Sequence, residues 1–214
     1  DLSPDQSQLM EIVLRESDRL NRIVSDFLVY ARPPRIERSV IDLASILSET
    51  LALLRHSPEL NPDHLICESY EPEVLLYNGD PNQLRQVFWN LARNAIQAMP
   101  SGGELSVSLS ARPGQEVAIT FRDNGDGMSR EQRDRLFEPF NSSTGGTGLG
   151  MAIVYQLVGD HNGRIQVESE AGKGTQISIR LPHDGRVSGS VPYRVGSESM
   201  MVPSAPGKFE GTAV

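Results

Sequence analysis

The sequence predicts an α/β two-layer sandwich, in which helices cover one face of a mixed sheet, preceded by one long helix. Between residues 36 and 182, short β-rich segments alternate with amphipathic helical segments, as in a sheet with helices packed on one side. Residues 1–33 carry a helical stripe of apolar side chains and no β-type pattern. With 214 residues, of which 38% are hydrophobic, the chain can bury one core with appendages.

The chain divides into three predicted parts. Residues 1–33 form a helix that Pro33 and Pro34 end, residues 34–182 form the sandwich, and residues 183–214 form a tail without periodicity. The tail is either disordered or an unrecognised docking segment. Within the sandwich we expect strands at 36–41, 65–70, 74–77, 105–111, 117–122, 164–168 and 176–181, a hairpin turn at 112–114, and helices at 43–55, 80–99 and 151–159.

The segment from Asp80 to Met99 is the most informative of the predicted helices. Asp80 can cap its N-terminus, and proline at its first position loses no hydrogen bond. Asn90 and Asn94 lie one turn apart beside its apolar stripe, so they can jointly present amide oxygens to a cation that also binds phosphates. Taken alone, the two asparagines are equally well interpreted as polar residues at a helix edge. The stripe itself consists of Leu84, Val87, Phe88, Leu91, Ala95 and Ile96.

Three short motifs follow this helix: DNGDGM at 123–128, LFEPF at 136–140 and GGTGLG at 145–150. Asp123 ends a β-rich segment, where a buried carboxylate can accept a hydrogen bond from the adenine amine and would repel the guanine carbonyl. Gly125 and Gly127 allow the backbone to approach a base closely. The last motif precedes an apolar helix, whose free N–H groups suit a phosphate. It lacks the Gly-Lys-Ser/Thr of a P-loop and the setting of a dinucleotide fingerprint.

In this order, the helix and the three motifs resemble the N, G1, F and G2 boxes of the sensor histidine kinases. The resemblance covers roughly residues 42 to 182 and is greatest to the nitrogen-regulation and pilus-regulation types. These kinases belong to the ATPase superfamily shared with gyrase, mismatch-repair ATPases and a heat-shock chaperone, which has the Bergerat ATP-binding fold. The resemblance implies binding of ATP or ADP and Mg²⁺ (Mg2+), and transfer of the γ-phosphoryl group to a histidine. It also implies relay to an aspartate on the receiver domain of a response regulator, and a homodimer in the full-length protein.

The resemblance also implies which residues form the site. Asn90 and Asn94 are expected to be catalytic, with Asn94 as a metal ligand and Asn90 supporting it. Asp123 is expected to bind the adenine base. The complete expected nucleotide-binding set is Asn90, Arg93, Asn94, Asp123, Gly125, Gly127, Met128, Phe137, Thr147, Gly148, Leu149 and Gly150.

Asn90 distinguishes between branches of the superfamily. In the branches of the superfamily that hydrolyse ATP, the residue at this position is typically a glutamate. The motif of the serine-kinase anti-sigma factors and of the mitochondrial-type kinases also resembles this glutamate version. Glutamate can act as a general base toward water, whereas an asparagine side chain has no useful basicity. Asn90 therefore favours the histidine-kinase branch. An ATP hydrolase of the same superfamily and a non-catalytic nucleotide-binding regulatory module remain as alternatives.

The N-terminal segment ESDRLNRIVSDFLVYARP resembles the second helix of the dimerisation and histidine-phosphotransfer domain. That domain is a four-helix bundle to which each protomer contributes two helices. Its phosphoacceptor histidine belongs on the first helix, which this sequence does not contain. We expect solvated or structural roles for the four histidines present, His56, His64, His161 and His183. The sequence therefore reads as a truncated kinase core without its own phosphoacceptor.

The resemblance is weakest in the lid, where residues 141–144 run directly into Gly145. The family usually has a slightly longer stretch here, often with threonine and lysine, so lid contacts cannot be transferred residue by residue. Arg93, next to Asn94, is the remaining candidate for a cation near the phosphates. A solvated arginine on the helix face is an equally good interpretation.

Composition fits an intracellular enzyme domain. The formal net charge of -8 argues against a nucleic-acid partner. We see no apolar run of membrane-spanning length and no signal peptide, which predicts a cytoplasmic domain; anchoring of the full-length protein to the inner membrane would come from upstream segments. The single cysteine, Cys67, permits no internal disulfide, and we expect it to be a small core residue.

Overall fold

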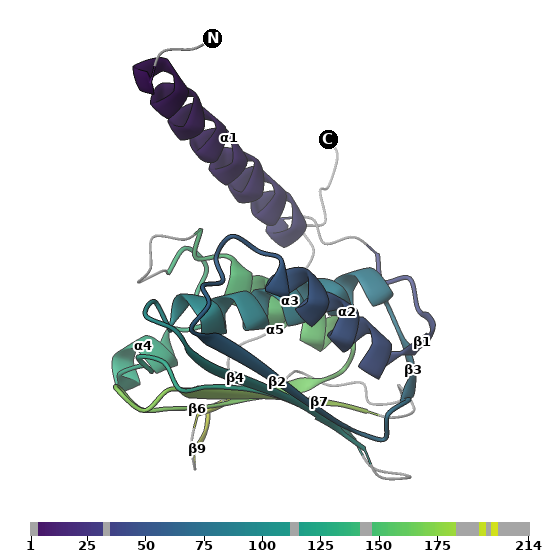
Figure 1. The fold of residues 1–214 in the computed structure, drawn as a ribbon. Coiled ribbons are helices and arrows are strands. Elements are labelled where there is room, and N and C mark those ends of the chain that lie inside the picture. Colours follow the sequence, from purple (N-terminus) through teal and green to yellow (C-terminus); the bar gives the residue numbers. More distant parts are fainter. Residues whose placement is uncertain are drawn as a thin grey trace, which may run out of the picture.

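We describe the protein from a computed structural model. The structure describes residues 4–31, 35–111, 116–141, 147–182, 193–195 and 198–200. The predicted stop at Pro33 and Pro34, the hairpin turn at 112–114, most of the lid and most of the tail lie outside these residues. Within them, the predicted α/β two-layer sandwich preceded by a long helix is confirmed (Figure 1).

A seven-stranded mixed sheet forms one layer. Its spatial order is β2 (His64–Glu71), β4 (Gly103–Ser110), β5 (Val117–Asp123), β7 (Thr175–Leu181), β6 (Arg164–Ser169), β8 (Tyr193–Val195) and β9 (Glu198–Met200). The β2–β4 and β6–β8 pairs are parallel and the other pairs are antiparallel. Side chains alternate between buried and more exposed along the central strands, as expected for a sheet covered on one face.

Three helices form the second layer, above one face of the sheet (Figure 1). They are α2 (Leu43–Arg55), α3 (Pro81–Gln97) and α5 (Gly150–Asp160). The predicted apolar stripe of α3 is buried in the core, together with apolar residues of α2, α5 and the inner face of the sheet. Asp80 caps α3 as predicted, because its carboxylate accepts hydrogen bonds from the N–H groups of Asn82 and Gln83.

Two further strands form a separate small sheet before and after β2. β1 (Ser39–Asp42) pairs antiparallel with β3 (Leu76–Gly79). We predicted β3 at 74–77, two residues too early, because Val74 and Leu75 extend the apolar run that precedes it. Asp42 ends β1 and caps α2, and its Oδ1 accepts hydrogen bonds from the N–H groups of Ala44 and Leu75.

The N-terminal helix α1 (Pro4–Ala31) extends away from the sandwich on the side of the helix layer (Figure 1). Its C-terminal end contacts α5, and Tyr30 packs against the core. Farther from the sandwich its apolar side chains are exposed, including Leu20 at 62% and Val24 at 55%. In the part of the chain that the structure describes, no helix has both the length and the hydropathy needed to cross a bilayer.

Three details differ from the sequence predictions. Cys67 is exposed rather than in the core, because β2 is an edge strand and its odd-numbered residues point away from the helix layer. A short helix, α4 (Arg130–Asp134), was not predicted; a capping box between Ser129 and Gln132 begins it. The short strands β8 and β9 were not predicted either, since three-residue strands carry too little periodicity to detect.

Candidate nucleotide site

Asp123 is the last residue of the central strand β5, and its side chain is only 7% exposed. Its Oδ1 accepts hydrogen bonds from the N–H of Gly125, at 3.0 Å, and from the N–H of Thr175, at 3.1 Å. Burial raises the pKa of this carboxyl above its usual value, and the two N–H donors offset part of that rise. The structure therefore holds a carboxylate at the C-terminal end of the central strand in a largely desolvated position.

The second oxygen of Asp123 is available to a ligand. Both N–H donors contact Oδ1, and Oδ2 accepts no hydrogen bond from the described residues. Oδ2 is also not among the buried side-chain atoms that lack a partner, so it retains some access to solvent. A donor such as an exocyclic amine can therefore reach Oδ2 without displacing a protein hydrogen bond.

The loop after Asp123 packs too tightly for side chains at its glycines. A Cβ at Gly125 would overlap the carbonyl oxygen of Ala98, at the end of α3. A Cβ at Gly127, whose φ is +62°, would overlap the carbonyl oxygen of Glu170 in the β6–β7 turn. The next residue, Met128, donates its N–H to the hydroxyl of Ser169 at 2.9 Å. The loop is therefore held between the end of α3 and the β6–β7 turn.

Asn90 and Asn94 lie on α3, and both side chains are half-buried. Asn90 faces the start of α5, where its Nδ2 donates to the carbonyl oxygen of Gly150 at 3.4 Å. The nearest atoms to a Cβ at Gly150 would be those of the Asn90 amide, at 3.7 Å. The Asn94 amide makes no hydrogen bond to a described residue, which leaves it free for a ligand.

The described ends of the lid are joined to each other. Phe140 donates its N–H to the carbonyl oxygen of Gly148 at 3.0 Å, and a Cβ at Gly148 would overlap the backbone of Phe140. Thr147 accepts the N–H of Leu149 through its hydroxyl at 3.2 Å. No side chain among the described residues caps the start of α5, so the N–H groups of its first turn suit an anion.

Phe137 packs against α5 through the ring of Tyr155, with centroids 5.4 Å apart. This contact connects the segment before the lid to the helix after it. Burial raises the pKa of Tyr155 above its usual value, consistent with a ring enclosed between these segments.

Arg93 points toward a different part of the molecule. Its Nε lies 2.9 Å from both carboxylate oxygens of Glu59, in the loop between α2 and β2. Both side chains are partly exposed, at 28% and 30%. The predicted contact of Arg93 with phosphate remains a prediction, and it would compete with this ion pair.

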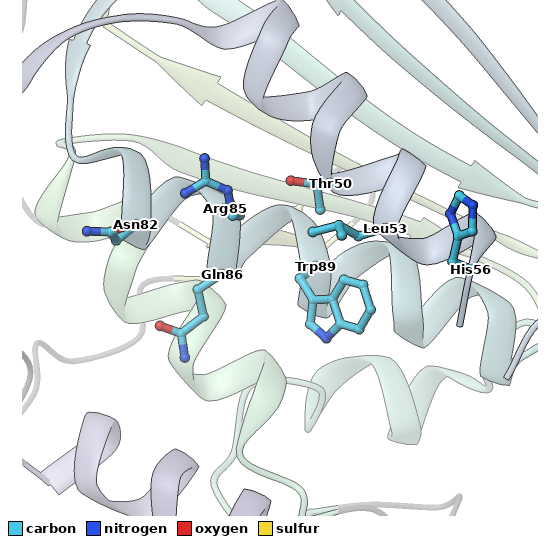
Figure 2. Close-up of a pocket in the computed structure, with 7 residues that line it drawn as sticks. All are labelled: Thr50, Leu53, His56, Asn82, Arg85, Gln86 and Trp89. Carbon is cyan, nitrogen blue, oxygen red and sulfur yellow. The ribbon is translucent and has the colours of Figure 1, made fainter. Parts of the chain in front are cut away.

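A groove lies on the helix layer, apart from the residues of the predicted site. It is a groove of about 630 Å³ between α2 and α3, with Trp89 and Leu53 beside each other at its centre (Figure 2). None of its lining residues belongs to the predicted nucleotide set. They are Thr50, Leu53, His56, Asn82, Arg85, Gln86 and Trp89. Among the described residues, no three His, Cys, Asp or Glu side chains come together to hold a metal ion.

Sequence reasoning missed the turn that supports Asp123 from the other side. Thr175 donates to the carboxylate, and Ser169 positions Met128 while also donating to the carbonyl oxygen of Gly174. A Cβ at Gly174 would overlap the carbonyl oxygen of Asp123. The glycine at 174 is the signal in the sequence that could have indicated this close approach of another backbone.

Comparison with known proteins identifies the family. The family model described as "Histidine kinase-, DNA gyrase B-, and HSP90-like ATPase" matches residues 79–185, half of the chain. The chain therefore belongs to this family, and the predicted recognition of a histidine-kinase ATP-binding catalytic domain is confirmed. The nitrogen-regulation or pilus-regulation type remains a prediction.

Curated relatives and solved structures agree with this assignment. Sporulation kinase E of Bacillus subtilis (strain 168) is 35% identical over 83% of this chain and 24% of its own length. The sensor histidine kinase ZraS of Escherichia coli (strain K12) is 36% identical over 82% of this chain and 37% of its own length. The chain thus spans roughly a quarter to two fifths of these relatives.

The structural neighbours are histidine kinases. Full-length ShkA in complex with AMPPNP superposes with a TM-score of 0.73 and 28% identity, over 85% of this chain and 40% of that chain. The mycobacterial sensor histidine kinase MprB superposes with a TM-score of 0.61 and 27% identity, over 68% of this chain and 97% of that chain.

The two glycines Gly127 and Gly172 provide a matched pair for testing how tightly the loop packs. Both have positive φ, but a Cβ at Gly172 would have no atom within 4 Å. We expect Gly172→Ala to lower the free energy of unfolding by about 1–2 kcal/mol, the cost of a left-handed backbone for an L-residue. Gly127→Ala should cost about 1–3 kcal/mol more, because its methyl group overpacks the site.

Urea denaturation of the two variants measures both costs. ADP affinity, measured by calorimetry on folded protein, should fall for Gly127→Ala and stay unchanged for Gly172→Ala. Equal stability losses for the two variants would contradict the close packing of Gly127 against Glu170.

Proposed function

We propose that this chain is the ATP-binding catalytic part of a sensor histidine kinase. It would transfer the γ-phosphoryl group of ATP to a histidine, for relay to a response-regulator aspartate in two-component signal transduction. The observation that carries this proposal is the buried Asp123 carboxylate with one oxygen open to a ligand, in a chain whose relatives are sensor histidine and sporulation kinases. Because the chain spans only part of these relatives, the activity of the whole protein is part of the proposal.

The residues of the site fit an adenine nucleotide. Oδ2 of Asp123 would accept the exocyclic amine of adenine, and the tightly packed loop at Gly125 and Gly127 would lie along the base. The uncapped N-terminus of α5 would face the phosphates. The half-buried Asn94 amide would supply an oxygen to Mg²⁺, which takes its remaining ligands from phosphate and water. ATP supplies the phosphoryl group, and the metal offsets its negative charge.

Asn90 supports transfer to a side chain rather than to water. An asparagine amide cannot accept the proton of an attacking water molecule. Its Nδ2 is also directed to the carbonyl oxygen of Gly150, so it acts as a donor that holds α3 against α5. Catalysis in this site would therefore come from positioning and charge neutralisation.

The partners follow from the kind of kinase proposed. The phosphoryl group would pass to the receiver domain of a response regulator. The exposed apolar stripe of α1, around Leu20 and Val24, would pair with other helices in a homodimer of the full-length protein. We propose a cytoplasmic location for the chain, with any attachment to the inner membrane made by segments outside it.

Asp123→Asn tests the choice of nucleotide. An amide keeps the shape of the carboxylate but donates as well as accepts, so it no longer disfavours guanine. We expect the preference for ADP over GDP, measured by calorimetry, to fall by about 1–3 kcal/mol. Asp126→Asn, the same change on an exposed carboxylate of the same loop, should leave the preference unchanged. Equal affinity of the wild-type chain for ADP and GDP would remove Asp123 as the adenine ligand.

Asn94→Ala tests the metal site. If the amide oxygen of Asn94 binds Mg²⁺, the variant should lose more affinity for Mg-ATP than for ATP in the presence of a chelator. Asn82→Ala is a suitable control, because Asn82 is an exposed asparagine near the start of the same helix. The same loss with and without metal would make Asn94 a structural residue.

Phosphotransfer in trans tests the reaction itself. We expect the chain, given labelled ATP and a separately folded dimerisation domain with its phosphoacceptor histidine, to place acid-labile, base-stable label on that domain. Asn94→Ala should reduce the rate. Release of free phosphate without labelling of the acceptor would indicate an ATP hydrolase. Nucleotide binding with neither product would indicate a non-catalytic regulatory module.

A further inference from the structure

The helices α3 and α5 run antiparallel and are joined at two points, one at the start of α5 and one at its end. At one end Asn90 contacts Gly150, in the predicted nucleotide site. At the other end the backbone N–H of Asp80, just before α3, donates to Nε2 of His161, just after α5, at 3.0 Å. Between these contacts the α3 side contains ten residue steps, about 15 Å of helix, and the α5 side contains eleven, about 16.5 Å. The two contacts therefore close a frame whose sides are similar in length.

His161 is completely buried, with 0% of its side chain exposed. Its Nε2 accepts the Asp80 N–H, so the proton of the neutral ring is on Nδ1, which donates to the carbonyl oxygen of Leu157 at 2.8 Å. Burial lowers the pKa of this ring below its usual value, and the hydrogen bond to Leu157 offsets part of that fall; the charges of Arg38, which lowers the pKa, and Asp80, which raises it, have smaller effects. Both ring nitrogens are thus used to connect the last turn of α5 to the first residue of α3.

The surroundings of His161 hold the connection rigidly. The Asp80 carboxylate accepts the N–H groups of Asn82 and Gln83 on Oδ1 and that of Glu37 on Oδ2. Arg38 donates to the carbonyl oxygen of Asp160, which immediately precedes His161. The ring of Tyr77 lies near that of His161, with centroids 6.4 Å apart. The segment that follows α1 therefore attaches to the same point as the two helices.

We propose that His161 is a positioning residue for the nucleotide site, which sets the axial position of α5 against α3 and thereby the distance between Gly150 and Asn90. This inference rests on the proposed function, because it assigns the ends of these helices to nucleotide binding. His161 contacts no residue of the predicted nucleotide set, so its effect passes through the two helices. A shift of about 1 Å at a site can reduce a rate by about 100-fold, so a small axial movement is sufficient.

Two substitutions separate the hydrogen bond from the space that the ring fills. His161→Leu keeps an apolar group of similar size but leaves the Asp80 N–H buried and without an acceptor. That N–H then has to reach water, which displaces the start of α3 from the end of α5. His161→Gln supplies an amide oxygen near the position of Nε2, so it can accept the same N–H.

We expect His161→Leu to bind ADP about tenfold more weakly than the wild type in calorimetry, under conditions where both are folded by circular dichroism. His161→Gln should restore ADP affinity to within about twofold of the wild type. Rescue by glutamine distinguishes positioning through Nε2 from a general loss of stability, because both variants remove the imidazole ring.

Leu109→Ala is the control for stability. Leu109 is a buried residue on β4, paired with Ile119 at the part of that strand away from Asp123. Its loss of stability, measured in urea, can be compared with that of His161→Leu, and its ADP affinity should equal that of the wild type. Wild-type affinity retained by His161→Leu, or a loss shared equally by the glutamine variant or by Leu109→Ala, would overturn the inference. If the wild-type chain itself binds no ADP, the proposed function fails instead.

Discussion

The burial of α3 is the constraint on which the rest of the molecule depends. One face of this helix, including Leu84, Val87 and Phe88, is completely enclosed in the core. Because side chains recur every 3.6 residues, the helix cannot rotate without exposing this face or burying charged groups. Asn90 is thereby held toward α5, while Arg93 is held toward the loop that contains Glu59. The burial of apolar side chains, which has no chemical specificity of its own, thus determines which polar groups of α3 face the site.

The same helix positions the loops at its ends through backbone contacts. The carbonyl oxygen of Ala98 accepts the N–H of Asp126 at 2.9 Å, and it leaves no room for a Cβ at Gly125. At the other end, Asp80 binds the backbone of Glu37 and of the first turn. Backbone contacts of this kind are short and have few rotatable bonds, so they position a loop more rigidly than long side chains do. This explains why the site is rich in glycines.

Much of the fold and the site could be predicted from local pattern. The periodicity of α3 predicted the helix layer, and Asn90, Asn94 and the glycine motifs that follow α3 predicted the family, because each pattern depends on neighbours in sequence. The failures depend on distant contacts. Cys67 was placed in the core because a strand pattern does not reveal that β2 lies at an edge. The Arg93–Glu59 ion pair joins residues 34 positions apart, and the hydrogen bond between Asp80 and the buried His161 joins residues 81 positions apart. Periodicity within one helix or strand cannot predict such contacts.

Two buried aspartates show how the fold separates a structural carboxylate from one that can bind a ligand. Burial acts to raise the pKa of Asp80, but three N–H donors outweigh it, so its pKa lies below the usual value. Both of its oxygens are occupied, and the group can only hold the backbone in place. Asp123 has two donors on a single oxygen, and its pKa is raised because desolvation is not fully compensated. The Asp123 carboxylate therefore still lacks a hydrogen bond that would compensate for its lost hydration. A donor on a ligand can supply that bond, and a buried carboxylate gains most from a hydrogen bond that the protein itself does not provide.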